Sequence, residues 1–214
     1  MHFASADAPR RHPALVITVL ALAGLTVAIM QTLMVPLIPE LPVILGVSPE
    51  DASWLITATL LAGAVATPSL SRLADMFGKK RMMLVSLVSV VAGSLLATFT
   101  SSFVLVVTAR TLQGCGMALI PIAISIMRDE LSRERLGSAV ALVSATLGIG
   151  AAIGLPLSGI VYEHFGWHAL FALSAIIGGL MIGAVHLVVP ESTVRTGGSF
   201  DFLGALLLSG ALIG

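Results

Sequence analysis

Charged residues are scarce in this sequence. Only 10% of its 214 residues are Asp, Glu, Lys or Arg, whereas a soluble domain carries roughly 25%. Hydrophobic residues make up 57% of the chain, and the mean hydropathy is +1.06. A water-soluble fold of this size could not cover that much apolar surface, so lipid must surround much of it. The sequence therefore predicts an integral membrane protein whose first partner is the lipid bilayer.

Several other features are missing, and each absence excludes a class of protein. The single cysteine, Cys115, excludes an internal disulfide and a CxxC metal site, and we interpret it as a helix-packing residue. Eleven Lys and Arg against eleven Asp and Glu give no net charge, which argues against nucleic acid as a partner. The sequence has no P-loop, GxSxG, HExxH or clustered metal ligands. It thus predicts no enzyme, no cofactor, no metal site and no ATP-driven pump within this chain.

Apolar segments long enough to cross a bilayer are what the sequence does contain. A hydrocarbon core of ~30 Å needs about 20 apolar residues in a helix. Six segments qualify, and they are Leu15–Ile38, Ala52–Leu73, Met82–Phe99, Phe103–Met127, Leu136–Tyr162 and His168–Val189. The first is too long for a signal-peptide core, so we expect it to remain in the protein. The prediction is an all-α membrane protein with a six-helix domain, 15–189, after a cytoplasmic tail, 1–14.

The last residues predict a linker and an incomplete helix. Residues 190–201 contain charged residues and glycines and are expected to form a cytoplasmic linker. A seventh apolar segment, 202–214, has 13 residues. At 1.5 Å per residue it would reach only about 20 Å, which is too short to cross a bilayer. We therefore expect a fragment of a longer chain, whose missing C-terminal half would be a partner.

The distribution of cations predicts the orientation of the chain. Connections on one side hold Arg10, Arg11, Arg72, Lys79, Lys80, Arg81, Arg128, Arg133, Arg135 and Arg195. Connections on the other side hold Glu40, Glu50, Asp51 and Glu163 and no Lys or Arg. Because cytoplasmic loops carry an excess of Lys and Arg, the N-terminus is predicted to be cytoplasmic. The expected location is the plasma (inner) membrane, crossed several times.

Arg110 lies inside the predicted fourth helix, where a charge is costly and rarely faces lipid. Gln113 at i+3 and Gly114 at i+4 share its helix face. These residues predict a polar centre on a transport path, and the alternative is an arginine that only extends outward to the interface. Gln31 and Thr32 in the first helix are candidates for the same path, or they bond neighbouring helices or their own backbone.

Two further groups of residues suggest moving parts. In the loop 71–81, Gly78 permits a tight turn, and Asp75 lies close to three cations. This loop either locks helices at the cytoplasmic face or carries only topogenic charge. In the fifth helix, Gly150, Gly154 and Ser158 form a stripe of small residues beside Pro156, which should bend the helix. That stripe is either a hinge or a simple packing surface.

At these residues the sequence resembles the major facilitator superfamily, and within it the fourteen-span drug:proton antiporters. The loop is similar to the signature G-x-x-x-D-R-x-G-x-R/K-R/K. The matching positions are Asp75, Gly78, Lys80 and Arg81, and the differing ones are Ser71 and Met76. The resemblance implies a cytoplasmic gate in which the loop contacts an acid at the end of the fourth helix, for which Asp129 is the candidate. It also implies a 3+3 inverted repeat.

The fourth and fifth helices carry the other similarities. The pattern R-x-x-Q-G-x-G matches at Arg110, Gln113, Gly114 and Gly116, and in the family this arginine is linked to proton coupling. The antiporter signature G-x-x-x-G-P-x-x-G-G is matched at Gly150 and Gly154, but Leu155 precedes Pro156, and Gly159 ends the run. The resemblance implies an antiporter hinge at Gly150, Gly154, Pro156 and Gly159.

One departure from the family concerns the first helix, where many fourteen-span members carry Asp-x-Thr. This chain has Met30-Gln31-Thr32, and no Asp or Glu lies deep in the six predicted helices. The resemblance implies a secondary active exporter of amphipathic small molecules or drugs, with the small-molecule substrate and protons as partners. The alternatives are a major facilitator importer of a metabolite and a truncated membrane protein that does not transport.

Overall fold

The computed structural model describes residues 13–191 and 210, and all regular structure in them is helical. The elements are α1 (Pro13–Thr32), η1 (Val35–Leu37), α2 (Leu41–Leu45), α3 (Pro49–Ala52), α4 (Trp54–Phe77), α5 (Lys79–Thr98), α6 (Phe103–Gly114), η2 (Cys115–Ala118), α7 (Leu119–Glu130), α8 (Arg133–Phe165) and α9 (Trp167–Val188). The predicted linker and seventh helix lie almost wholly outside the described residues.

Six helical segments of the described chain are long and apolar enough to cross a membrane, which confirms the predicted fold class. They are Pro13–Leu37, Pro49–Phe77, Lys79–Thr98, Phe103–Glu130, Arg133–Phe165 and Trp167–Val188. Most of them extend beyond the predicted apolar segments because polar residues continue the helices past the hydrophobic core. The glycine turns at Gly78, with φ 115°, and Gly166, with φ 77°, end α4 and α8 in a conformation that favours glycine.

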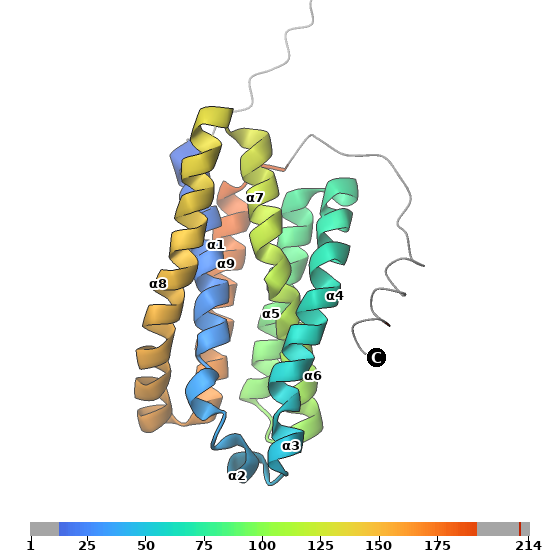
Figure 1. The fold of residues 1–214 in the computed structure, drawn as a ribbon, viewed down its shortest axis with the longest axis vertical. Helices are drawn as coiled ribbons and strands as arrows, with labels where there is room; N and C mark the ends of the chain where they lie inside the picture. Colours follow the sequence, from blue (N-terminus) through green and yellow to red (C-terminus); the bar gives the residue numbers. More distant parts are fainter. Residues whose placement is uncertain (1–12, 192–209, 211–214) are drawn as a thin grey trace, which may run out of the picture.

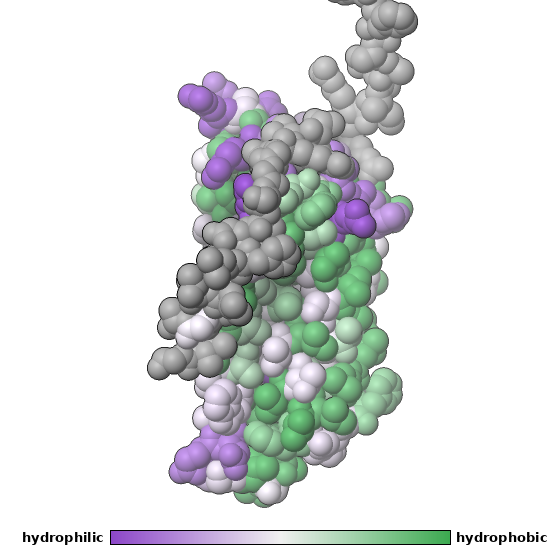
Figure 2. Space-filling model, turned by 90° about the vertical axis from the view of Figure 1, so that its right-hand side faces the viewer, coloured by the Kyte–Doolittle hydropathy of each residue, from purple (hydrophilic) through white to green (hydrophobic). Residues whose placement is uncertain are grey.

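The helices run roughly along the long axis of the molecule, with α8 and α4 on opposite flanks (Figure 1). The α4–α5 and α7–α8 connections lie at one end, and α2 and α3 lie at the other. The first of these ends, which carries Lys79, Lys80, Arg128 and Arg133, is called the cationic end below. Figure 2 shows hydrophilic residues gathered at both ends and hydrophobic residues between them. This surface suits a bundle that spans a bilayer along its long axis.

The pairing of helices follows a symmetric pattern. The first span packs along α8 of the fifth span, and α4 of the second span packs along α6 of the fourth. If the first, second and third spans change places with the fourth, fifth and sixth, the first–fifth pair becomes the fourth–second pair. The same exchange leaves the pair α5·α9 unchanged, since these helices belong to the third and sixth spans. The pattern is the one expected for two inverted three-helix repeats.

The stripe of small residues on α8 is a packing surface against α1. A Cβ at Gly154 would lie 1.9 Å from the Thr32 Oγ1, and a Cβ at Gly150 would lie 2.6 Å from the Ala28 Cβ. The Ser158 hydroxyl donates a hydrogen bond to the Leu33 carbonyl. Close backbone approach through small residues is a common way in which membrane helices associate. The structure therefore shows the stripe packed closely against α1.

This contact predicts a large difference between a glycine substitution in α8 and one in α9. Gly154→Ala would force α8 away from α1, and overpacking of this kind typically costs about 1–3 kcal/mol. Gly179→Ala in α9 is the control, because Gly179 is exposed and nothing lies within 4 Å of a Cβ there. We expect the full-length protein in detergent to unfold at a lower temperature with Gly154→Ala and at an unchanged or slightly higher temperature with Gly179→Ala. Equal unfolding temperatures for the two variants would contradict the contact.

Candidate functional site

The site forms around α6, which lies against two neighbouring helices with almost no side chain between them. A Cβ at Gly114 would lie 2.5 Å from the Thr59 carbonyl oxygen of α4. A Cβ at Gly93 of α5 would lie 2.4 Å from the Ala109 carbonyl oxygen of α6. Only glycine allows backbones to approach this closely. As a result, polar side chains on α6 reach a backbone carbonyl of α4 and a side-chain hydroxyl of α5.

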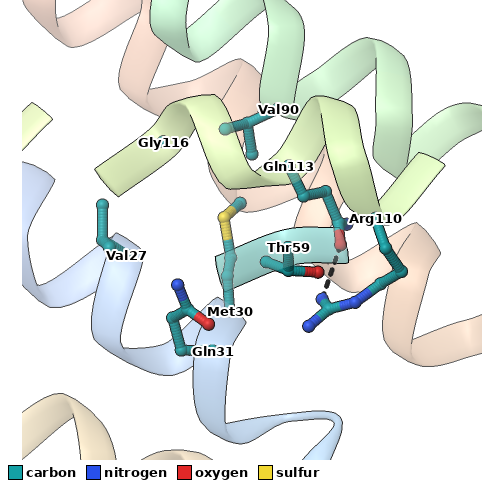
Figure 3. A pocket seen from close by; sticks show the side chains of 8 residues that line it. All are labelled: Val27, Met30, Gln31, Thr59, Val90, Arg110, Gln113 and Gly116. Atoms are coloured by element: carbon teal, nitrogen blue, oxygen red, sulfur yellow. Dashed lines mark hydrogen bonds between the residues drawn. The ribbon is translucent and has the colours of Figure 1, made fainter. Parts of the chain in front are cut away.

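The Arg110 side chain points into the bundle, and the residue is only 5% exposed. Its Nε donates to the Leu55 carbonyl oxygen of α4 at 3.2 Å, and its Nη1 donates to the Gln113 Oε1 at 2.7 Å (Figure 3). Arg110 therefore does not extend outward to the interface, which was the alternative. Its charge is held by acceptors inside the protein: the Gln113 side chain about one turn further along α6 and the Leu55 carbonyl of the adjacent α4.

The hydrogen bonds continue from Gln113 into α5. The Gln113 Nε2 donates to the Ser94 Oγ at 2.8 Å, and the Ser94 hydroxyl donates to the Val90 carbonyl oxygen at 2.8 Å. A continuous chain therefore runs from Leu55 through Arg110, Gln113 and Ser94 to Val90. Leu55 and Ser94 were not among the predicted site residues. For Ser94 the only available signal was a hydroxyl within an apolar span, and for the Leu55 carbonyl there was none.

A small cavity of about 20 Å³ opens beside this chain. Its lining residues are Val27, Met30, Gln31, Thr59, Val90, Arg110, Gln113 and Gly116 (Figure 3). Gln31 of α1 thus lines the same cavity as Arg110 and Gln113, whereas Thr32 lies at the α1–α8 contact and its hydroxyl donates to the Ala28 carbonyl at 2.9 Å. A cavity of this size has room for about one water molecule.

The described residues that line this cavity include no carboxylate to balance the charge. Among the residues described, the ion pairs are those of Lys79, and no Asp or Glu oxygen lies within 4.0 Å of the Arg110 guanidinium. The Thr59 hydroxyl donates to the Leu55 carbonyl at 2.8 Å, so that oxygen accepts from both Thr59 and Arg110. The site is therefore cationic and buried, and the two hydrogen bonds of its guanidinium go to neutral acceptors.

The fourth span changes its helical geometry directly beside the site. Cys115–Ala118 forms the 3₁₀ turn η2 between α6 and α7, and Gly116 within it lines the cavity. The Ser89 hydroxyl of α5 donates to the Leu112 carbonyl at 3.0 Å, just before this turn. A stretch of 3₁₀ geometry in the middle of a helix often marks a hinge or a strained segment.

A second polar group lies at the cationic end and joins α5 to α7. The Lys79 Nζ lies 2.6 Å from the Asp129 Oδ2, 3.4 Å from the Ser125 carbonyl oxygen and 4.0 Å from the Asp75 Oδ1. The Lys79 side chain is 6% exposed, and the Asp129 side chain is 15% exposed. Asp75 and Asp129 were both predicted gate residues, and the structure brings them together around Lys79. Lys79 itself was missing from the predicted gate.

The other predicted gate residues lie at a different contact. The Lys80 Nζ donates to the His186 carbonyl oxygen at 2.8 Å, near the end of α9. A Cβ at Gly78 would lie 2.5 Å from the Glu191 Oε1, so the Glu191 carboxylate lies over the turn. Arg81 is exposed. The loop therefore contacts α7 through Lys79 and the end of α9 through Lys80 and Gly78.

The predicted hinge residues of α8 are divided between two faces. Gly150 and Gly154 face α1, while Pro156 and Gly159 are exposed, and nothing lies within 4 Å of a Cβ at Gly159. The helix α8 continues through Pro156 without interruption.

In the part of the chain that the structure describes, no three His, Cys, Asp or Glu residues are grouped so as to hold a metal ion.

Known proteins share both the sequence pattern and the fold. A Mycobacterium tuberculosis protein named multidrug resistance protein B homolog is 29% identical over 168 residues, 78% of this chain and 31% of that protein. The tetracenomycin C resistance and export protein of Streptomyces glaucescens is 28% identical over 90% of this chain and 36% of its own length. The putative multidrug resistance protein MdtD of Citrobacter koseri is 30% identical over 80% of this chain and 36% of its own length.

This chain thus spans about a third of the length of the curated relatives it matches. Among solved structures, the human organic anion transporter MFSD10 (TETRAN) superimposes with a TM-score of 0.71 and 17% identity, covering 94% of this chain and 54% of that one. The sequence pattern of the Major Facilitator Superfamily matches residues 20–212, which is most of the chain. With six spans, a matching fold and a matching sequence pattern, this chain belongs to the Major Facilitator Superfamily.

Proposed function

We propose that this chain is the N-terminal part of a secondary active exporter that moves amphipathic small molecules out of the cell in exchange for protons. The observation that carries the proposal is the Arg110 guanidinium, buried within the fourth span beside a cavity and hydrogen-bonded to two neutral acceptors. Charged side chains within membrane spans are rare and mark substrate or ion pathways. The arrangement is expensive to maintain, and a transport path is the simplest reason for retaining it.

The relatives support export as the direction of transport. Two of them are named multidrug resistance proteins, and a third is named a resistance and export protein. Because this chain covers about a third of each, the activity of the whole protein is a proposal. We further propose that the N-terminus faces the cytoplasm, which the distribution of cations supports.

The exposed helices support a second domain as partner. In the most apolar stretches of the spans that contain α4 and α8, only 17% of the stretch is buried. In the corresponding stretches of the other four spans, 33% to 56% is buried. In the proposed transporter a C-terminal half would cover these helices and close a substrate cavity against Arg110. Alternating access would then follow from rocking of the two halves about the site between them.

The contact at the cationic end is the proposed cytoplasmic gate. The Lys79–Asp129 pair ties the start of α5 to the end of α7, and Lys80 ties the same loop to α9. Both contacts hold three spans together at the end that the sequence predicts to be cytoplasmic. We propose that these contacts hold the loop in the shape in which it meets the C-terminal half when the transporter is open to the outside. The packing of Gly150 and Gly154 on α1 would keep the N-terminal half rigid during that movement.

Efflux by the full-length transporter tests the role of Arg110. In everted membrane vesicles driven by a proton gradient, we expect wild-type protein to accumulate amphipathic dyes and drugs, and a protonophore to abolish the accumulation. Arg110→Ala should reduce it to background while the protein is still expressed. Arg110→Lys should give intermediate transport, because it retains the charge but not the planar donor geometry.

Thr111→Ala is the matched control for the Arg110 variants. Thr111 is the next residue on α6, and it is exposed. Its hydroxyl donates a hydrogen bond to the Val107 carbonyl, one turn earlier on the same helix, at 2.9 Å. We expect this variant to transport like wild type. Unchanged efflux by Arg110→Ala would remove the arginine from the mechanism, and accumulation in the opposite direction would identify an importer.

A mutant cycle at the cationic end tests the proposed gate. Asp129→Asn would leave the Lys79 ammonium largely buried without its close partner, and breaking a buried pair in this way costs about 3–5 kcal/mol. Lys79→Met combined with Asp129→Asn removes the stranded charge, so the double variant should unfold at a higher temperature than Asp129→Asn alone.

The exposed Arg81 offers a control in the same loop. Arg81→Ala should change the unfolding temperature of the full-length transporter very little, because exposed charges contribute little to stability. The gate interpretation fails if the losses caused by Lys79→Met and by Asp129→Asn simply add in the double variant, since additivity would mean that the two residues do not interact.

A further inference from the structure

We propose that Ser94 is a positioning residue of the Arg110 site: its hydroxyl fixes the orientation of the Gln113 amide and, through it, the Arg110 guanidinium. The consequence for transport rests on the proposed function, whereas the interaction itself does not. Neither the sequence pattern nor the comparisons point to this residue. The inference is carried by the directions of the hydrogen bonds between α5 and α6.

The direction of each bond is fixed by the chemistry of its groups. An arginine has five N–H donors and no acceptor, so the 2.7 Å contact with Gln113 must be accepted by Oε1. The Gln113 amide nitrogen is then left to donate to the Ser94 Oγ at 2.8 Å. The single hydroxyl proton of Ser94 goes to the Val90 carbonyl at 2.8 Å. A flipped amide would place its NH₂ group against the guanidinium, donor against donor.

Burial makes the Ser94 hydroxyl hard to replace. Ser94 is 0% exposed, and Gln113 and Arg110 are also buried. Without the hydroxyl, an amide N–H of Gln113 would lose its acceptor in a site closed to bulk water, and an unsatisfied buried donor is costly. Gly93 precedes Ser94 and lets α5 approach α6, since a Cβ there would lie 3.3 Å from the Gln113 Cγ. The close approach explains why a side chain as short as serine reaches Gln113.

Ser94 differs from other serines in the membrane spans. Ser174 in α9 is also buried, but its hydroxyl bonds only to its own backbone, at the Leu170 carbonyl 2.9 Å away. Ser94 makes the equivalent backbone bond and in addition accepts a bond from another span. The second bond is what assigns it a role in ordering the site.

The test compares Ser94→Ala with Ser86→Ala in the full-length transporter. Ser86 lies on the same helix and is also 0% exposed, but its hydroxyl has no hydrogen-bond partner among the described residues. Per folded molecule, we expect Ser94→Ala to lower the efflux rate about tenfold, as loss of one buried bond would do. Ser86→Ala should stay within about twofold of wild type, because it removes no bond. Ser94→Thr keeps the hydroxyl and should restore most of the rate.

A double-mutant cycle separates positioning from a general loss of packing. If Ser94 acts through Gln113, adding Ser94→Ala to a Gln113→Leu variant should change neither the efflux rate nor the unfolding temperature further. Ser86→Ala should have the same small effect in both backgrounds. The proposal is overturned if Ser94→Ala behaves like Ser86→Ala, or if its losses add fully to those of Gln113→Leu.

Efflux and the unfolding temperature test the proposed function and the role of Ser94 separately. If the wild-type protein exports no amphipathic compound from a wide panel, the proposed function fails. The coupling between Ser94 and Gln113 in the unfolding temperature would still decide whether the hydroxyl orients the amide. Export without that coupling would overturn the role of Ser94 and leave the proposed function in place.

Discussion

A guanidinium within the hydrocarbon layer must be given acceptors by the protein, and most of this structure can be understood from that requirement. The Arg110 charge has no bulk water around it and no carboxylate among the described neighbours. An unsatisfied buried charge costs far more than a lost neutral hydrogen bond. The chain meets the requirement with a backbone carbonyl of α4 and a glutamine one turn away on α6.

Glycine is what makes this solution geometrically possible. The Leu55 carbonyl reaches Arg110, and the Ser94 hydroxyl reaches Gln113, because α4, α5 and α6 lie closer together than ordinary side chains permit. Gly114 removes the side chain between α6 and α4, and Gly93 removes it between α5 and α6. Gly150 and Gly154 allow the same close approach between α8 and α1, the pair of helices that corresponds to α4 and α6 in the repeat. Each three-helix repeat is thus attached to the other by a close glycine contact.

The sequence predicts the six spans and the inward Arg110 because both depend on local properties. Apolar length determines a span, and a spacing of three residues puts Arg110 and Gln113 on one helix face. The Leu55 carbonyl and the Ser94 hydroxyl could not be predicted, since they depend on the register of α4 and α5 against α6. At the gate, successive side chains of α5 differ in direction by about 100°. Which of Lys79, Lys80 and Arg81 meets Asp129 therefore depends on how α5 is rotated, which spacing alone does not determine.

The polar site and the gate contact join the same two spans. The third span holds Lys79 and Ser94, and the antiparallel fourth span holds their partners, Asp129 and Gln113. Between those partners lies η2, whose four residues rise about 2.0 Å each, compared with 1.5 Å in an α-helix. The turn therefore lengthens the fourth span by about 2 Å relative to a continuous α-helix. In this structure the Lys79–Asp129 contact and the Gln113–Ser94 contact form together, on either side of η2.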